Sequence, residues 1–432
     1  MMRMRVGHVV VGMSRSAAAR SVLAGALLSS AGCSDEATVT TLEPLQGAAG
    51  AAPSADADAP VYALLTQIYG PEDRTVYIYL SHSLDLAGVD LTTAREYAGV
   101  TNFNAVGGRL LVSSGEAPTI TEFEITPELE WVEGRTVSFD GYPLSDNANW
   151  YSQFVLDDHT AYLPFDGYKR IVWDPTDMLI VGTMEDTTLV PQMGPLMLEA
   201  GGNRNGLRTD GAVRQAFFYH DEDWFRFGRD SLVVAYDPVT HAEGEHITVP
   251  CPGLAIATAD EAGYTYFSTW DYLPGMALYG EGPAPCAARL TPEGALDAAW
   301  TTDFTSLTGG RYVTNFRYVG GGRAVGNVLH PEEMAVDFSQ PLDPEVVTNL
   351  WESGPQWHFW SFDLNAGVAQ PVEGVDVEIG SSAQFAVLDD RTFVFLPYDQ
   401  QSRSKIYEID ASGAASEHLD VPGDVFKWIR VR

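Results

Sequence analysis

A repeated pattern of two strands and a tight turn is the feature that most constrains how this chain can fold. Residues 154–166 have the sequence FVLDDHTAYLPFD, and residues 385–399 have the sequence FAVLDDRTFVFLPYD. Each copy contains a strand, an Asp-Asp turn and a second strand that ends in Leu-Pro-aromatic-Asp. β-Branched and aromatic residues between turn-forming residues are typical of antiparallel strands joined by hairpins. The pattern therefore predicts a body built from repeated antiparallel sheets.

A third strand accompanies these pairs along the chain, and its spacing indicates the architecture. Its copies are FEITPEL from Phe123, IVWDPTD from Ile171, VVAYDPVTH from Val233, ARLTPEG from Ala288, WSFDLNAG from Trp360 and IYEIDASG from Ile406. They lie roughly 45 to 70 residues apart, which is the spacing of four-stranded propeller blades. The strands from Val61 to about Arg95 add a seventh unit. We therefore predict an all-β fold, a seven-bladed β-propeller over residues 60–432, with six or eight blades as alternatives.

The end of the chain is predicted to close this ring. Residues 425–431 (VFKWIRV) form a strand that can pair with the N-terminal strand near residues 61–68. Ring closure removes the exposed sheet edges that invite aggregation. A pair of β-sandwiches is the rival architecture, but no low-complexity boundary divides the body into two domains.

The N-terminus has the pattern of an export signal. Positive residues precede a run of small and apolar residues at 21–32 (SVLAGALLSSAG), which is too short to span a bilayer. Residues 1–32 are therefore predicted to be a signal peptide. The segment ends in Ser30-Ala31-Gly32-Cys33, which resembles the bacterial lipobox, although Ser30 stands where Leu is usual. The resemblance implies that Cys33 is lipidated after cleavage, and a plain secretory signal is the alternative.

A flexible tether is expected to follow the lipidated cysteine. Residues 34–59 contain almost no large apolar side chains and many Ala, Ser, Gly, Pro and Asp, so they cannot offset the entropy of ordering. We therefore assign residues 33–59 to Cys33 and a tether. The sequence predicts an exported protein of the cell envelope, attached to a bacterial membrane through its lipid only, at the periplasmic face or the cell surface.

The net charge limits which partners the protein can bind, and the cysteine count indicates its compartment. The chain has 59 Asp and Glu against 25 Lys and Arg, a formal charge of -34, which repels the phosphate backbone of nucleic acids. Nucleic acid is therefore excluded as an expected partner. With Cys33 lipidated, Cys251 and Cys286 remain, and an even pair in an oxidising compartment is expected to form a disulfide.

Three long connections indicate where a ligand could bind. In a propeller, the connections between the second and third strands of every blade lie on one face, and the chain has long ones at residues 220–230, 269–285 and 330–358. Their aromatic rings and carboxylates would suit a planar or cationic ligand, a sugar or a cation. The predicted ligand-binding residues are His220, Asp221, Asp223, Trp224, Trp270, Asp271, Tyr272, His330, Trp357 and His358. The third connection also contains Glu332 and Glu333, and both cysteines map to the same face.

No motif specifies a reaction. The chain lacks His-Glu-x-x-His, Gly-x-Ser-x-Gly, a Walker loop, CxxC and Gly-x-Gly-x-x-Gly. His241 and His246 would point to opposite faces of an extended strand, so they are not expected to share a metal. We therefore assign no catalytic residue and predict no cofactor, although a divalent metal would suit the acidic loops.

Two segments carry a family resemblance. Residues 153–184 and 217–243 resemble the propeller lipoproteins of myxobacteria and relatives whose genes accompany siderophore loci and which are described as iron-transport proteins. The resemblance covers about residues 60–432 and rests on pattern rather than on an invariant motif. It implies an envelope location and a link to iron or siderophore uptake, and it supplies no catalytic residues.

Three functions follow as hypotheses. The first, which the sequence favours, is a non-enzymatic envelope lipoprotein that binds a ferric siderophore or an envelope protein through the face with the long connections. The second is a propeller enzyme of the lactonase or hydrolase type with a central metal, for which Asn147, Asn149, Asn315 and His330 are available at inner strand starts. The third is a protein-interaction scaffold.

Overall fold

The structure is a computed structural model whose compact folded unit spans Ala57–Arg432. It describes residues 59–70, 74–144, 154–165, 169–185, 188–190, 192–200, 206–209, 211–222, 225–270, 273–300, 304–343, 346–347, 350, 354–380, 384–399, 401–410 and 412–432. The predicted signal peptide, the lipidation site at Cys33 and the tether up to residue 58 lie outside the described residues. Asn147 and Asn149 lie outside them as well.

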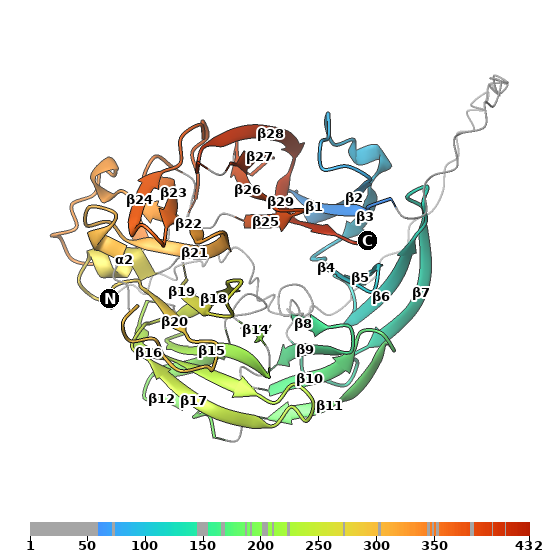
Figure 1. Cartoon of the computed structure of the whole chain (residues 1–432), viewed down its shortest axis with the longest axis horizontal. Helices are drawn as coiled ribbons and strands as arrows, with labels where there is room; N and C mark the ends of the chain where they lie inside the picture. Colours follow the sequence, from blue (N-terminus) through green and yellow to red (C-terminus); the bar gives the residue numbers. More distant parts are fainter. Residues whose placement is uncertain are drawn as a thin grey trace, which may run out of the picture. The chain divides into compact units, whose positions relative to one another are not determined.

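Seven β-sheets in the described residues form the blades of a seven-bladed propeller, as predicted (Figure 1). Blade 1 contains β29 (Asp424–Arg430), β1 (Tyr62–Tyr69), β2 (Arg74–Ser81) and β3 (Arg95–Ala98). Blade 2 contains β4 (Phe103–Val106), β5 (Arg109–Ser113), β6 (Thr119–Ile125) and β7 (Trp131–Ser138). Blade 3 contains β8 (Phe154–Asp157), β9 (Thr160–Phe165), β10 (Lys169–Asp174) and β11 (Leu179–Glu185).

The other blades follow in chain order. Blade 4 contains β12 (Gln192–Met193), β13 (Leu196–Ala200), β14 (Gly206–Thr209), β15 (Ala212–His220), β16 (Phe227–Tyr236) and β17 (Glu243–Val249). Blade 5 contains β18 (Leu254–Ala259), β19 (Thr265–Thr269) and β20 (Ala287–Leu290). Blade 6 contains β21 (Val313–Gly320), β22 (Arg323–Leu329), β23 (Trp357–Asp363) and β24 (Val368–Pro371). Blade 7 contains β25 (Gln384–Leu388), β26 (Arg391–Tyr398), β27 (Arg403–Ile409) and β28 (Ala415–Pro422).

The short hairpins form because their sequences suit tight turns. Asp389 and Asp390 connect β25 to β26 with φ angles of 50° and 64°, a left-handed conformation that Asp tolerates better than most residues. In the matching turn of blade 3, the Asp157 carboxylate accepts a hydrogen bond from the His159 amide at 2.8 Å. The six predicted third strands are β6, β10, β16, β20, β23 and β27. Each is the third strand of its blade, when the strands of blade 4 are counted from β14.

The C-terminal strand closes the ring, as predicted. β29 pairs antiparallel with β1, with Trp428 opposite Leu64. The Lys427 ammonium donates to the carbonyl of Phe103 at 2.6 Å and to the side chain of Asn104 at 2.8 Å, both at β4 of blade 2. The last strand therefore completes blade 1 and also contacts its neighbour.

Blade 5 departs from the expected four strands. After β20, the described residues 291–300 contain no fourth strand and make one isolated bridge, between Leu290 and Leu296. Asp297 then forms an ion pair back to Arg289 of β20 at 2.6 Å. The hairpin of β12 and β13 is an addition to blade 4, where β13 and β14 both pair with β15. The four-strand prediction therefore holds for five blades and is wrong in detail for these two.

The apolar core lies in the seams between neighbouring blades. Each of the seven seams contains one cluster of buried side chains from the two blades that meet there. Between blades 2 and 3, for example, Phe139 packs edge to face on Trp173 with ring centroids 5.9 Å apart. Within the part of the chain that the structure describes, no helix is long and apolar enough to cross a membrane.

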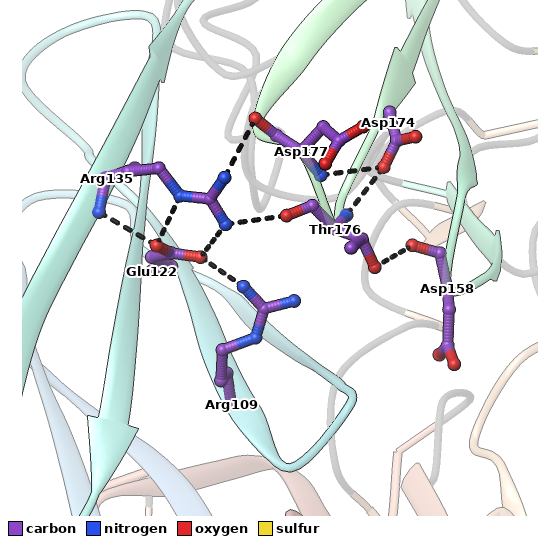
Figure 2. Close-up of polar contacts among 7 residues, drawn as sticks. All are labelled: Arg109, Glu122, Arg135, Asp158, Asp174, Thr176 and Asp177. Atoms are coloured by element: carbon purple, nitrogen blue, oxygen red, sulfur yellow. Dashed lines mark hydrogen bonds and ion pairs between the residues drawn. The ribbon is translucent and has the colours of Figure 1, made fainter.

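A polar cluster adds to the seam between blades 2 and 3 (Figure 2). Glu122 of β6 accepts hydrogen bonds from the Arg135 side chain of β7 at 2.8 Å and 3.1 Å and pairs with Arg109 of β5. Arg135 also donates to the carbonyls of Thr176 at 2.6 Å and Asp177 at 3.3 Å, in the β10–β11 turn of blade 3. Burial raises the pKa of Glu122, but the Arg135 bonds and the charge of Arg109 outweigh it and hold this pKa below its usual range.

Candidate functional site

Three long connections between second and third strands lie side by side. Loop 1 (residues 221–226) joins β15 to β16, loop 2 (270–286) joins β19 to β20, and loop 3 (330–356) joins β22 to β23. Loop 2 contains α2 (Leu273–Leu278) and loop 3 contains the 3-10 helix η4 (Pro331–Glu333). We call these loops together the loop face. Each joins the second and third strands of its blade, so the strand order puts all three on one side of the propeller, as the sequence predicts.

Side-chain contacts join the described parts of the three loops. Trp270 of loop 2 packs edge to face on Phe218 of β15, which lies beside Phe227 at the end of loop 1, with centroids 6.1 Å and 6.0 Å apart. Tyr279 of loop 2 packs on Phe338 of loop 3 with centroids 5.1 Å apart. Connections that are far apart in sequence thus form one surface.

A disulfide fixes the end of loop 2. Cys251, just after β17, is bonded to Cys286, and their Cα atoms are 5.8 Å apart. The Thr269 hydroxyl lies between the two segments and contacts the carbonyls of Pro252 at 3.0 Å and Cys286 at 2.9 Å. The pairing expected from the cysteine count is therefore present. A groove of about 800 Å³ runs along the disulfide and is lined in part by Phe227 and Glu281.

Several predicted ligand-binding residues support the loops. His220 is 3% exposed at the end of β15, and its Nδ1 lies 2.7 Å from the Asp221 carbonyl. The Asp221 carboxylate accepts hydrogen bonds from the amides of Phe225 at 2.8 Å and Arg226 at 3.0 Å, which braces loop 1. Trp270 is half-buried against the same aromatic cluster. The predicted residues Asp223, Trp224, Asp271 and Tyr272 lie outside the described residues.

Trp357 lies in the core and presents no ring to a ligand. It is 3% exposed, and its indole N–H donates to the Leu350 carbonyl at 2.6 Å. Its ring packs in the seam between blades 6 and 7. The predicted ligand contact at this position is therefore corrected to a packing role that anchors loop 3.

Two histidines and a glutamate meet at the base of loop 3. β22 and β23 pair antiparallel with Val328 opposite His358, so His330, two residues further on, is a diagonal neighbour of His358. Their ring centroids are 3.9 Å apart. Glu333 Oε1, from η4, lies 3.0 Å from His358 Nε2 and 3.4 Å from His330 Nδ1. We call His330, Glu333 and His358 the His-Glu group.

Burial keeps one of these histidines neutral. His330 is 7% exposed, and burial lowers its pKa to about 4, with the charges of His358 and Arg311 acting in the same direction. Near pH 7 its ring therefore keeps a free lone pair, as a metal ligand needs. Its Nε2 atom has no hydrogen-bond partner among the described residues. The nitrogen that faces the two glutamates is Nδ1, so Nδ1 is the atom of this ring that would bind an ion.

The spacing of the His-Glu group fits a transition-metal ion. One nitrogen or oxygen from each residue lies within 4.8 Å of the other two. Ligands bound tetrahedrally at roughly 2.0–2.1 Å would be separated by about 3.4 Å, close to the 3.4 Å and 3.0 Å observed from Glu333 to the two imidazoles. Imidazole nitrogens with one carboxylate favour zinc, iron, copper or nickel over calcium or magnesium.

The position of this group corrects one expectation. His330 follows β22, the second strand of blade 6, so it lies on the loop face and not at the start of an inner strand. Asn315 does lie on the inner strand β21, where it is 2% exposed with a φ angle of 49°. The sequence analysis predicted His330 and His358 as ligand-binding residues and placed Glu333 among the loop carboxylates that would suit a cation, but did not select it as a site residue. The sequence His-Pro-Glu-Glu directly after a strand was the signal available for doing so.

Fold and site together define a seven-bladed β-propeller with a His-Glu group on its loop face. No protein-family model and no curated protein sequence matches this chain. Among solved structures, a periplasmic gluconolactonase from Pseudomonas aeruginosa is similar over 86% of this chain and 99% of its own, with 13% identity and a TM-score of 0.53. A candidate 6-phosphogluconolactonase from Bacteroides uniformis is similar over 87% of this chain and 100% of its own, with 10% identity and a TM-score of 0.50. Likeness at such low identity shows the propeller fold alone.

Proposed function

We propose that this chain is a hydrolase of the lactonase type whose reactive centre is the His-Glu group with a divalent transition-metal ion. The observation that carries this proposal is the spacing of His330, Glu333 and His358, whose ligand atoms lie within 4.8 Å of one another beside the loops. The two structural neighbours named as lactonases lend support, since they match this chain over nearly their whole length. The formal charge of -34 favours an uncharged lactone over a phosphorylated one.

In this proposal the residues of the site have two roles in ester hydrolysis: three bind the metal ion and one transfers a proton. His330, Glu333 and His358 would hold the ion, which when bound polarises the lactone carbonyl as a Lewis acid. Glu332 lies beside the group, and because Arg311 pairs with its Oε1, its other carboxylate oxygen, Oε2, is the one that would accept a proton from the attacking water. The water oxygen bonds to the carbonyl carbon, the ring C–O bond breaks, and the proton passes to the departing alkoxide oxygen. The product is one open-chain hydroxy acid.

Hydrolysis of glucono-δ-lactone, followed by acid release at constant pH, tests the proposal. After chelation the protein should lose activity, and added Zn²⁺ or Fe²⁺ should restore it. His358→Ala and Glu333→Gln should each lower kcat/KM by about 100-fold, since each removes a direct ligand and outer-shell changes alone cost about 10–100-fold. The matched control is His159→Ala, an exposed histidine in the β8–β9 turn, which should leave activity unchanged. Turnover that survives chelation and both site substitutions would exclude this centre.

A second candidate is a binding protein without turnover, which the adjacency of the three loops and the groove of about 800 Å³ favour. Its ligand would be a metal chelate of the ferric-siderophore kind or an envelope protein. Trp270, half-buried between loops 1 and 2, reports on that surface. Quenching of its fluorescence by a ferric siderophore, lost in Trp270→Phe, would support this function; an unchanged signal together with lactone turnover would reject it.

We also propose that the protein is an exported lipoprotein. The sequence pattern that ends at Cys33 supports this location. Cells grown with labelled palmitate should yield a labelled, membrane-associated protein, and Cys33→Ala should yield an unlabelled one. A soluble, unlabelled wild-type protein in the fraction released from the envelope would leave a plain secretory signal as the explanation.

A further inference from the structure

A second carboxylate lies as close to the His-Glu group as the first. Glu332 precedes Glu333 in η4, and its Oε1 lies 3.5 Å from His330 Nδ1, against 3.4 Å for Oε1 of Glu333. Both distances are near the roughly 3.4 Å that separates two ligands of a tetrahedral ion with bonds of about 2.0–2.1 Å. By distance alone, Glu332 could become a fourth protein ligand.

Arg311 pairs with Oε1 of Glu332, the oxygen that would bind the ion. Arg311, just before β21, donates to Glu332 Oε1 from Nε at 2.8 Å and also from Nη2. A carboxylate oxygen has two lone pairs, so two N–H donors use the coordinating capacity of this atom. While the pair is formed, Oε1 lies beside the His-Glu group without a free lone pair to give to an ion.

A second contact, to Thr308, holds the Arg311 guanidinium in place. Its Nη1 donates to the Thr308 carbonyl at 3.0 Å. Thr308 is fully buried, and its hydroxyl donates to the Arg311 carbonyl at 2.5 Å, with the Phe304 carbonyl as an alternative acceptor at 3.0 Å. Arg311 is therefore held in a turn that is braced independently of the acidic residues, and a planar fork held in this way loses little additional entropy when it pairs with Glu332.

We propose that Arg311 is a positioning residue that keeps Glu332 out of the coordination sphere and so leaves one position of the ion open. Four protein ligands close a metal site and make it structural, whereas three ligands leave the fourth position for water or substrate. This inference rests on the proposed function, because it concerns the same ion. Its consequence is that losing Arg311 should strengthen metal binding while it weakens turnover.

Metal affinity, measured without reference to activity, tests this directly. Zn²⁺ is titrated into the purified full-length protein in competition with a chromogenic chelator. Arg311→Gln should bind Zn²⁺ about 10-fold more tightly than wild type, the scale on which outer-shell partners act, and its kcat should fall. Arg311→Lys, which keeps the charge but not the two-nitrogen fork, should show a smaller gain. The double variant Arg311→Gln with Glu332→Gln should lose the gain, because the additional ligand is gone.

The control separates coordination from simple charge. Arg430→Gln also removes one cation, but Arg430 pairs with Asp389 at 2.7 Å in the β25–β26 turn, away from the loop face. It should leave Zn²⁺ affinity unchanged. If Arg311→Gln and Arg311→Lys, both folded by circular dichroism, bind Zn²⁺ no more tightly than Arg430→Gln, the inference is wrong while the metal site stands. If wild type binds Zn²⁺ no better than His358→Ala, the proposed metal centre fails and this inference with it.

Discussion

Replacing Glu122 by Gln should destabilise the propeller at the seam between blades 2 and 3. The side chain is 9% exposed and accepts bonds from the Arg135 amide at 3.0 Å, from the Arg135 guanidinium at 2.8 Å and 3.1 Å, and from Arg109 at 2.5 Å (Figure 2). The Gln oxygen can keep the amide bond, but its NH₂ group would face guanidinium donors. The substitution therefore removes the charged bonds without removing the cations.

The expected loss of unfolding free energy depends on how exposed the two arginine partners of Glu122 are. Arg135 is 52% exposed, so solvent screens its side-chain bonds and they add little to stability. The bond from Arg109, which is 24% exposed, is counted at about 1.5 kcal/mol. We therefore expect Glu122→Gln to lower the free energy of unfolding by about 1.5 kcal/mol in urea titrations at pH 7. The control Asp420→Asn, in an exposed pair with Arg403, should change it by less than about 0.5 kcal/mol.

The pH dependence gives an independent check. The pKa of Glu122 is lower in the folded protein than in the unfolded chain, so its contribution is complete above the usual carboxyl pKa and is lost as the pH falls through the folded value. The difference between wild type and Glu122→Gln should therefore be constant from about pH 7 to 5 and narrow below about pH 4.5. A difference below about 0.5 kcal/mol at pH 7, or one that widens on acidification, would refute the assigned role of the carboxylate.

Three further perturbations test the seams and loops by urea unfolding. In Gly134→Ala the new Cβ would meet Glu122 Cγ at 2.7 Å, so this variant should cost about as much as Glu122→Gln, and the double variant should cost clearly less than the sum. Trp428→Ala removes a side chain 2% exposed at the ring closure and should cost about 3–5 kcal/mol; a loss under about 1 kcal/mol would contradict this packing. Reducing the bond between Cys251 and Cys286, which are 35 residues apart, should cost about 4 kcal/mol on the loop-entropy estimate and leave Zn²⁺ binding unchanged.

The repeat could be predicted from sequence because local chemistry determines it. Asp389 and Asp390 adopt the left-handed conformation of a tight turn, and Asp157 supports the matching turn of blade 3 by accepting a hydrogen bond from the His159 amide. Recurrence of such turn residues between strands is what made the hairpins predictable. The extra hairpin of blade 4 and the missing fourth strand of blade 5 do not follow, because both depend on which segments find a pairing partner in the folded ring. Propensity carries little information about that choice.

The site was only partly predictable, for a geometric reason. Adjacent residues of a strand point to opposite faces of the sheet, so only one of Trp357 and His358 can meet His330 across the strand pair. The sequence identifies both as candidates, and only the pairing of β22 with β23 shows that Trp357 faces the core while His358 meets His330. The part played by Glu333 likewise depends on how η4 turns back over these strands.

The closure of the ring by β29 has a consequence for how the protein is made. Blade 1 takes β1, β2 and β3 from residues 62–98 and β29 from residues 424–430, so one strand of this sheet is synthesised long after the other three. Until residues 424–430 have been synthesised, β1 has an unpaired edge, which is the kind of edge that invites pairing with another chain. The ring therefore closes only after every other strand of the seven sheets has been made, and a chaperone that covers the edge of β1 would act before that point.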